Sequence, residues 1–364
     1  MKNNPTLTSQ GRQPRSIVRI NGVVFTGVVS WEVENNRFAA PDTYRLTLAV
    51  SKLPSANGPA WFASQTPLTV EILVGFPANP DQFDASEMTS LILGDADTFD
   101  WEVFDYAITL AGRDKSAPLL DTKASEKYPN LTASQIAAKL AQKYGLTPVV
   151  TATSTKAGKY YEIDHVRMQD ERTEWDLLQW LAREEQFVCY VNGDELHFEP
   201  EPKASQDPYV FQYTPATATS PVGFNGQTLC LTRTMTIARG VTVTVQSWNH
   251  KQKKTFSRKA SFPGGGGKNP QQYSYVIGGL TPDQAQQRAN QILAEISKHA
   301  VKLKVTGPAD NLLLMTDVIK VSGTSTALDQ VFYPDVITRE FDVEDGYHWT
   351  VEAKNQSPQS EPTL

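Results

Sequence analysis

The sequence has few of the features that mark secreted, membrane-spanning or disulfide-stabilised proteins. Only two of its 364 residues are cysteine, too few for a disulfide framework, so nothing in the chain requires an oxidising compartment. No stretch approaches the roughly 18–20 apolar residues that span a bilayer, and we expect no membrane insertion. The N-terminus lacks the apolar core and small-residue cleavage site of a secretory signal. We therefore expect folding in a cytoplasm.

A strong excess of charge of either sign is also missing. Lys and Arg number 34 against 40 Asp and Glu, a net charge of −6, so the surface as a whole is not a nucleic-acid-binding footprint. Gly and Pro, at 22 and 23 residues, are near average usage, which excludes a collagen-like or low-complexity chain. With 40% hydrophobic residues the chain can bury a sizeable core.

Recognisable catalytic motifs are missing as well. The sequence contains no CxxC and no HExxH, and its five histidines are scattered. The run Gly264–Lys268 resembles a phosphate loop, but it lacks the first Gly at the required spacing, and Asn269 stands where Ser or Thr must bind magnesium. We expect no enzyme, and we assign no catalytic, cofactor-binding or metal-binding residue and no cofactor.

What the chain does have is strand periodicity. Across residues 16–113 apolar and polar residues alternate, as in strands with one buried face. Asn21-Gly22 lies between two such segments, and this dipeptide suits the type I′ turn of a hairpin. Short strands at close spacing favour an antiparallel barrel or sandwich. We predict a first β-barrel over 16–113, preceded by a flexible arm over 1–15.

Residues 114–207 change character and predict a small α/β insert domain. Thr132 with Gln135 forms a candidate capping box for a helix that ends near Gly145. A second helix is expected over about 173–185, followed by a hairpin turning at Asn192-Gly193.

Residues 208–356 return to strand patterns and predict a second β-barrel, with a polar tail over 357–364. One helix interrupts the strands at about 281–299, where Thr281, Pro282 and Gln284 mark its start. The expected fold class is α+β, mainly β: two tube-like antiparallel β-barrel domains with the small α/β insert domain between them. Two β-rich units of similar size suggest an old duplication, although the sequence offers no residue-by-residue alignment.

One basic cluster falls between a predicted strand and the glycine run, so we predict a hairpin tip or long loop over 251–259. Phe256 is its single aromatic residue, which does not support a base-stacking platform. The cluster is either a solvated loop or a contact to an acidic partner. Its basic residues are Lys251, Lys253, Lys254, Arg258 and Lys259.

Three segments, in order, resemble the phage late-control D family of contractile-tail baseplate hub proteins. The first is AGRDKSAPLLD over 111–121, the second is LTASQIAAKLAQKYGL over 131–146, and the third is EWDLLQWLARE over 174–184. The third leads into a hairpin with a short turn, as in the family. The hub part of type VI secretion spike proteins is similar.

The resemblance implies a structural role. In that family two tube-like barrels per subunit assemble as a homotrimer whose ring adapts the six-fold tail tube to the three-fold central spike and lines the channel for genome passage. The implied partners are further copies of the chain, the central spike protein, tail tube or tail-terminal tube proteins, the tape measure protein and baseplate wedge proteins. DNA would be passing cargo only. The implied location is the tail baseplate of a virion, assembled in the bacterial host cytoplasm.

Two other interpretations remain open from the sequence. Residues 131–146 also resemble the first half of a LysM motif, which would make the chain a peptidoglycan-binding module of a tail or cell-wall-associated protein. Against this, Thr147–Val150 has strand character where LysM has its second helix. The other interpretation is a cell-wall hydrolase that uses a pair of carboxylates as acid and base.

Overall fold

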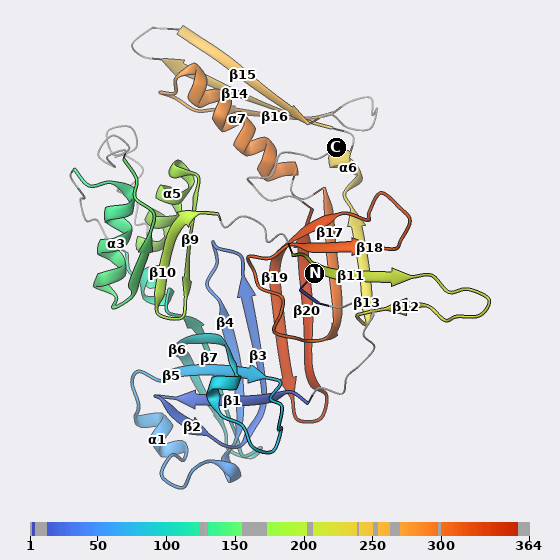
Figure 1. The fold of residues 1–364 in the computed structure, drawn as a ribbon. Helices are drawn as coiled ribbons and strands as arrows, with labels where there is room; N and C mark the ends of the chain where they lie inside the picture. Colours follow the sequence, from blue (N-terminus) through green and yellow to red (C-terminus); the bar gives the residue numbers. More distant parts are fainter. Residues whose placement is uncertain are drawn as a thin grey trace.

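The computed structural model describes residues 2–3, 13–123, 128, 130–154, 173–201, 207–238, 240–249, 254–262, 270–297 and 300–355. The chain is mainly β, as expected (Figure 1). No helix in these ranges is long and apolar enough to cross a membrane. The polar tail and most of the expected N-terminal arm lie outside the described residues. Within the arm, Lys2 Nζ lies 2.5 Å from Asp317 Oδ1, and Asn3 exchanges hydrogen bonds with the backbone of Val210.

The first β unit is built from hairpins and short helical turns. The Asn21-Gly22 hairpin predicted from the sequence is present, because β1 pairs with β2 across it. The elements are β1 (Arg15–Ile20), β2 (Val23–Phe25), β3 (Val28–Asn36), β4 (Thr43–Ala49), η1 (Val50–Lys52), α1 (Pro59–Ser64), β5 (Thr69–Gly75), η2 (Ala85–Glu87), β6 (Thr89–Glu102) and β7 (Ala107–Asp114).

A small α/β domain follows and has its own hydrophobic cluster. The capping box of Thr132 and Gln135 is present at the start of α3, and Thr173 with Asp176 makes a second one at α5. Both helices pack against a three-stranded sheet of order β8-β10-β9. The elements are α2 (Ala117–Asp121), α3 (Ala133–Lys143), β8 (Thr147–Val150), α5 (Glu174–Glu185), β9 (Phe187–Asn192) and β10 (Glu195–Pro200).

The second β unit is interrupted by an inserted subdomain. The insertion is a sheet of order β15-β14-β16 on which α7 packs, with a separate hydrophobic cluster that includes Val243 and Ala285. The elements are β11 (Tyr209–Thr214), β12 (Gly223–Phe224), β13 (Thr228–Arg233), α6 (Met235–Ala238), β14 (Val241–Asn249), β15 (Lys254–Phe262), β16 (Gln271–Val276), α7 (Pro282–Ser297), β17 (Val301–Pro308), β18 (Ile319–Ser322), β19 (Val331–Asp342) and β20 (Gly346–Lys354).

The two β units are not separate closed barrels in the described residues. Their strands form one 14-stranded sheet, joined where β3 pairs with β19. A single hydrophobic cluster continues through both units. The prediction of two barrel domains is therefore not confirmed: each unit is an open, curved sheet, and the sequence offered no sign that strands 300 residues apart would pair.

Aromatic packing stabilises the join between the units. Trp31 on β3 is buried, stacks on Phe341 of β19 with ring centroids 5.7 Å apart, and donates from Nε1 to Ser16 Oγ at 2.8 Å. Tyr347 on β20 lies against the same indole ring. Such aromatic contacts add to the stabilisation from area burial, so the join is an integral part of the core.

Candidate functional site

Eight consecutive strands form a regular antiparallel run through both units. Their order is β13-β17-β20-β19-β3-β4-β7-β6, and every neighbouring pair is antiparallel. One face carries the shared core, and the alternate side chains form what we call the polar face. Its members include Thr232, Lys302, Lys304, Glu352, Thr338, Glu340, Glu32, Glu34, Arg45, Thr47, Asp100 and Glu102.

Acidic side chains crowd the middle of the polar face. Glu32 and Glu340 are direct cross-strand partners at the join of the two units. Burial raises the pKa of Glu32, and the charges of Glu340 and Glu34 raise it further, while Arg45 opposes them. Like charges directly opposite one another destabilise a sheet. The Glu32–Glu340 pair therefore does not stabilise the isolated chain, although Arg45 opposite Glu32 offsets part of the repulsion.

Both ends of the eight-strand run are open edges among the described residues. At one end, β6 pairs with β5 from Thr89 as far as Asp95. The segment Thr98–Glu102 of β6 pairs only with β7. At the other end, β13 pairs only with β17. Unpaired strand edges are templates for pairing with another chain.

The open half of β6 has a counterpart inside the molecule. In β19 the first residues pair with β18, a bulge follows between Pro334 and Val336, and the rest pairs with β3. In β6 the first residues pair with β5, a bulge follows between Ala96 and Thr98, and the outer edge of the rest is unpaired. The two strands have the same plan, and only β19 has its outer neighbour within the chain.

Apolar side chains accompany both open edges. Trp101 at the end of β6 is 49% exposed, although it lies on the core-facing side of the sheet beside Phe99. On β13, Leu229 and Leu231 lie on the core-facing side and are partly buried. The apolar layer beneath the sheet therefore extends to both edges, and Trp101 at the β6 edge is its most exposed member.

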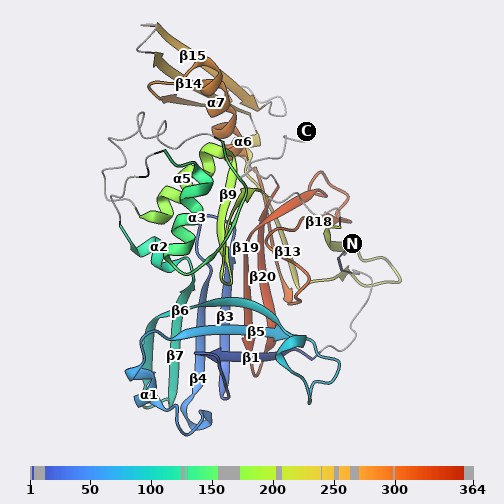
Figure 2. The same ribbon diagram turned by 60° about the vertical axis from the view of Figure 1, so that its left-hand side comes forward.

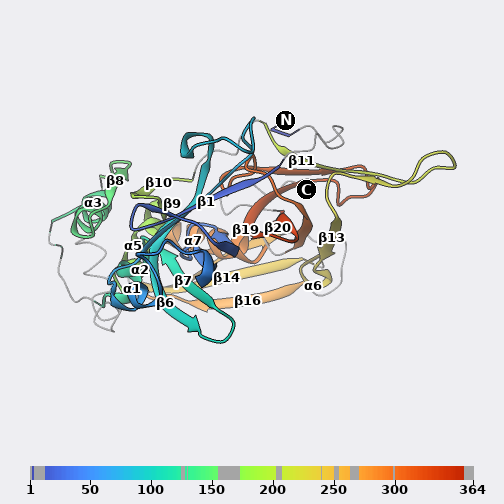
Figure 3. The same cartoon turned by 90° about the horizontal axis from the view of Figure 1, so that it is seen from below.

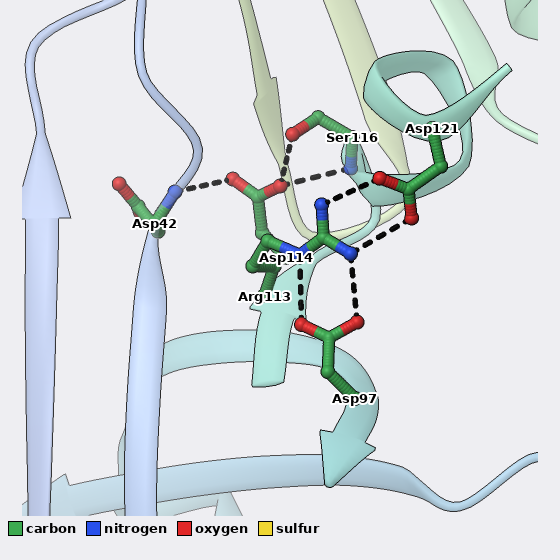
Figure 4. A network of polar contacts seen from close by, with 6 residues as sticks. All are labelled: Asp42, Asp97, Arg113, Asp114, Ser116 and Asp121. Atoms are coloured by element: carbon green, nitrogen blue, oxygen red, sulfur yellow. Dashed lines mark hydrogen bonds and ion pairs between the residues drawn. The ribbon is translucent and has the colours of Figure 1, made fainter. Parts of the chain in front are cut away.

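A polar network ties the small α/β domain to the first β unit (Figure 4). Arg113 on β7 donates two hydrogen bonds to Asp97 of β6, at 2.7 and 2.8 Å, and two to Asp121 of α2, at 2.9 and 2.8 Å. These contacts raise the pKa of Arg113 and lower that of Asp121. Asp97 and Asp121 are accessible to solvent, so the network orients the domain more than it stabilises it.

The same network continues into a junction of three parts of the chain. The backbone N–H of Asp42 donates to Asp114 Oδ2 at 2.9 Å, and Asn35 Nδ2 donates to Asp42 Oδ2 at 2.8 Å. Asn35 Oδ1 accepts a 2.7 Å hydrogen bond from Arg339 of β19, which also donates to the Leu313 carbonyl. Burial raises the pKa of Asp42 to about 7, helped by the charge of Asp114.

A cavity of about 210 Å³ opens at this junction, and its lining is part polar and part apolar. Its walls come from both β units and from the small domain, including Asn35, Asp114, Trp175, Tyr190, Asn311 and Arg339.

The structure also changes the sequence-based interpretation of the basic cluster. The predicted basic loop 251–259 is wrong for its second half, because Lys254–Phe262 forms strand β15, where Arg258 and Lys259 are exposed. Lys251 and Lys253 lie outside the described residues. Within the described ranges, no group of three or more His, Cys, Asp or Glu side chains could hold a metal ion.

The two open edges and the junction network were not predicted from the sequence. The alternation in 254–260 could have indicated β15, since Phe256 and Ala260 lie on one face. No comparable local pattern in the sequence predicts that β3 pairs with β19.

Comparison with solved structures places this fold among phage tail proteins. The tail protein of Neisseria meningitidis MC58 aligns with a TM-score of 0.67 at 13% identity, over 94% of this chain and 96% of that one. A 43 kDa tail protein of prophage MuSo2 from Shewanella oneidensis aligns with a TM-score of 0.67 at 14% identity, over 95% and 99%. An Escherichia coli type VI secretion component aligns with a TM-score of 0.54 at 11% identity, over 95% and 79%.

That E. coli component is itself described as structurally similar to the T4 tail proteins gp27 and gp5. At these identities the likeness concerns the fold, and at that level it confirms the resemblance to the baseplate hub family that the sequence indicated. No family model and no curated protein matches the chain.

Proposed function

We propose that the chain is the structural baseplate hub of a contractile phage tail or tail-like particle, and that three copies form a ring. The observation that supports this best is the pair of open edges on β6 and β13. The in-chain pairing of β19 with β3 supplies the template: β6 of one copy pairs with β13 of the next in the same way.

The strand count is compatible with such a ring. Eight strands per copy is an even number, so the alternation of direction continues across each join, and β6 meets the neighbouring β13 antiparallel. An interface between two different edges is heterologous, and heterologous interfaces close into rings when the rotation between copies allows it. Closure would also cover Trp101 and remove the open edges. The number three follows from the hub family.

In this assembly the polar face lines the channel. Its acidic centre around Glu32, Glu34 and Glu340 would repel the phosphates of nucleic acid, so that DNA passes as cargo and is not retained. Two similar β units per copy give the ring six similar units, which suits an adapter between a six-fold tail tube and a three-fold spike.

The further partners proposed are the tape measure and baseplate wedge proteins, and the location is the tail baseplate of a particle assembled in the bacterial cytoplasm. The role is mechanical and non-enzymatic. The peptidoglycan-binding alternative gains no support from the contacts of α3, which packs its apolar side against β8 and β10.

The open edges can be tested with one charge on each. Trp101→Glu places a carboxylate on the β6 edge, and Leu231→Glu places one on the β13 edge. Each variant alone should reduce the solution mass from three chains to one, because burying an unpaired charge in the join is costly. Mixed together, the two variants still hold one intact edge each and should form a dimer. Val276→Glu, at a side chain 82% exposed in the inserted subdomain, is the matched control and should remain trimeric.

Circular dichroism distinguishes loss of assembly from loss of folding. The proposal holds if folded Trp101→Glu chains are monomeric and the mixture forms dimers. It is overturned if both folded variants keep the mass of the wild type, or if the mixture stays monomeric while each variant is folded.

A further inference from the structure

Two hairpins, one in each β unit, carry similar short sequences. The β6–β7 hairpin reads FDWEVFDY over Phe99–Tyr106, and the β19–β20 hairpin reads FDVEDGY over Phe341–Tyr347. Both begin with Phe-Asp, place a Glu two residues after that Asp and end on Tyr. The similar residues thus cover the end of the first strand of each hairpin and its turn.

The two hairpins also lie at the same end of the sheet. These residues are cross-strand partners in sequence across the sheet: Asp342 pairs with Ser30, Ser30 with Thr47, Thr47 with Thr109, and Thr109 with Asp100. The first Asp of each hairpin therefore occupies the same row of the sheet, and both tips project beyond that row on the same side. Figure 3 shows the β6–β7 hairpin extending clear of the neighbouring elements.

Both tips expose apolar side chains among carboxylates. Phe104 is 94% exposed and Val343 is 64% exposed, and Val103 and Tyr106 are exposed beside Phe104. The neighbouring acids Glu102, Asp105, Glu344 and Asp345 are exposed too. No Lys or Arg occurs in 98–107 or in 340–347. Large exposed apolar side chains of this kind mark interaction surfaces.

The opposite end of the sheet is built differently in the two units. Strand β7 leads there into the small α/β domain, whereas β13 leads there into the inserted subdomain, which returns through β17. Figures 1 and 2 show both domains at that end. Two unlike domains per copy give a three-copy ring only three-fold symmetry at that end. At the hairpin end, two like tips per copy give six repeats.

We propose that the β6–β7 and β19–β20 tips together form the surface by which the ring docks end-on to a six-fold protein ring. This inference rests on the proposed function and adds to it which end faces the six-fold partner and which side chains make the contact. We expect the partner ring to have apolar pockets that receive Phe104 and Val343. Lys or Arg side chains should border these pockets and face the carboxylates of the tips.

The test measures binding of the hub to hexameric rings of the tail-tube protein that accompanies this chain in its particle. The double variant Phe104→Ser with Val343→Ser removes the apolar anchors, and we expect binding to weaken about tenfold or more. A second double variant, Asp105→Asn with Glu344→Gln, should flatten the salt dependence of binding. Val276→Ser, which removes an exposed apolar side chain elsewhere, should bind as the wild type does.

Solution mass is recorded for every variant, so that the two proposals fail separately. Trimeric tip variants with weakened tube binding support the inference. Trimeric tip variants that bind the tube rings unchanged overturn it and leave the hub proposal intact. Tip variants that lose the trimer also overturn it, because the tips then belong to the contact between copies. A wild type that stays monomeric, alone and when mixed with its tube and spike proteins, contradicts the hub proposal itself.

Discussion

Strands β19 and β6 have the same plan but different surroundings. Each pairs first with a short strand, is bulged, and continues into a hairpin at the same end of the sheet. Beyond its bulge β19 is covered by β3, and its Phe341 stacks on the buried Trp31. Beyond its bulge β6 has an open edge, and Trp101 is half exposed. The chain thus pairs one of these two similar strands internally and leaves the other with an unpaired edge, which in the proposed ring would pair with a second copy.

The largest expected effect comes from breaking the internal join. Trp31→Ala should lower the free energy of unfolding by about 3–5 kcal/mol, because it leaves a cavity in the core and removes the stack on Phe341. Trp101→Ala at the open edge of β6 should lower it in the isolated chain by less than about 1 kcal/mol. Urea denaturation of the two variants measures both values. Equal losses would show that the two joins do not differ in the way described.

The next largest loss of stability is expected on replacing Arg339, whose guanidinium on β19 donates to Asn35 on β3. Arg339→Met removes two 2.7 Å hydrogen bonds and leaves Asn35 Oδ1 and the Leu313 carbonyl without these donors. We expect a loss of about 2–3 kcal/mol, since unsatisfied buried acceptors keep their desolvation cost. Arg258→Met, at an exposed position of β15, is the control and should change stability little. If Arg339→Met leaves the free energy of unfolding unchanged, these two hydrogen bonds do not stabilise the junction.

Acidity should also affect the junction. Because the folded-state pKa of Asp42 is raised to about 7 from its ordinary 3.8, its protonated form favours folding. That contribution is complete below the ordinary pKa and is lost as the pH rises through about 7. Between pH 5 and pH 8 the chain should lose about 2–3 kcal/mol of stability from this group. Burial also raises the pKa of Asp114, which acts in the same direction.

Asp42→Asn tests this assignment. The variant should reduce the difference between the unfolding free energies at the two pH values, whatever it does to the absolute stability. Equal pH dependence in the variant and the wild type would assign the effect to other groups.

The smallest effect is expected at Arg113. Arg113→Lys loses the paired geometry toward Asp97 and Asp121, and lysine cannot replace a guanidinium at such a site. Since both carboxylates are accessible to solvent, we expect a loss of about 1 kcal/mol or less. The more sensitive readout is limited proteolysis between the first β unit and α2, which should accelerate. Unchanged cleavage would show that the small domain is oriented by its other contacts.

The sequence predicted what local chemistry determines. The capping box at Thr132 and the hairpins predicted at Asn21-Gly22 and Asn192-Gly193 depend on residues a few positions apart, and the structure contains all three. In the second hairpin Asn192 pairs with Glu195, so its turn residues are Gly193 and Asp194, one position later than predicted. The join of β3 with β19 depends on pairing across 300 residues, which strand periodicity cannot register. For the same reason the two units were expected as separate barrels. The junction around Asp42 and Arg339 exists only once that join has formed.

The similarity of the two units could be located only with the register in view. Phe99 and Phe341 lie on the core-facing side, and the Asp that follows each lies on the polar face. In the sequence alone the two hairpin segments are seven or eight residues long, differ in length by one residue and are separated by more than 230 positions. So short a match is not evidence of similarity by itself. It becomes evidence because strand pairing places Asp100 and Asp342 in the same row of the sheet.

The most direct test of the central claim is the solution mass of the purified chain, measured by light scattering behind a sizing column. If β6 of one copy completes β13 of the next as β19 completes β3, the species has three times the chain mass of 40.3 kDa. A folded protein that stays at one chain mass, alone and when mixed with its tube and spike proteins, would contradict the account.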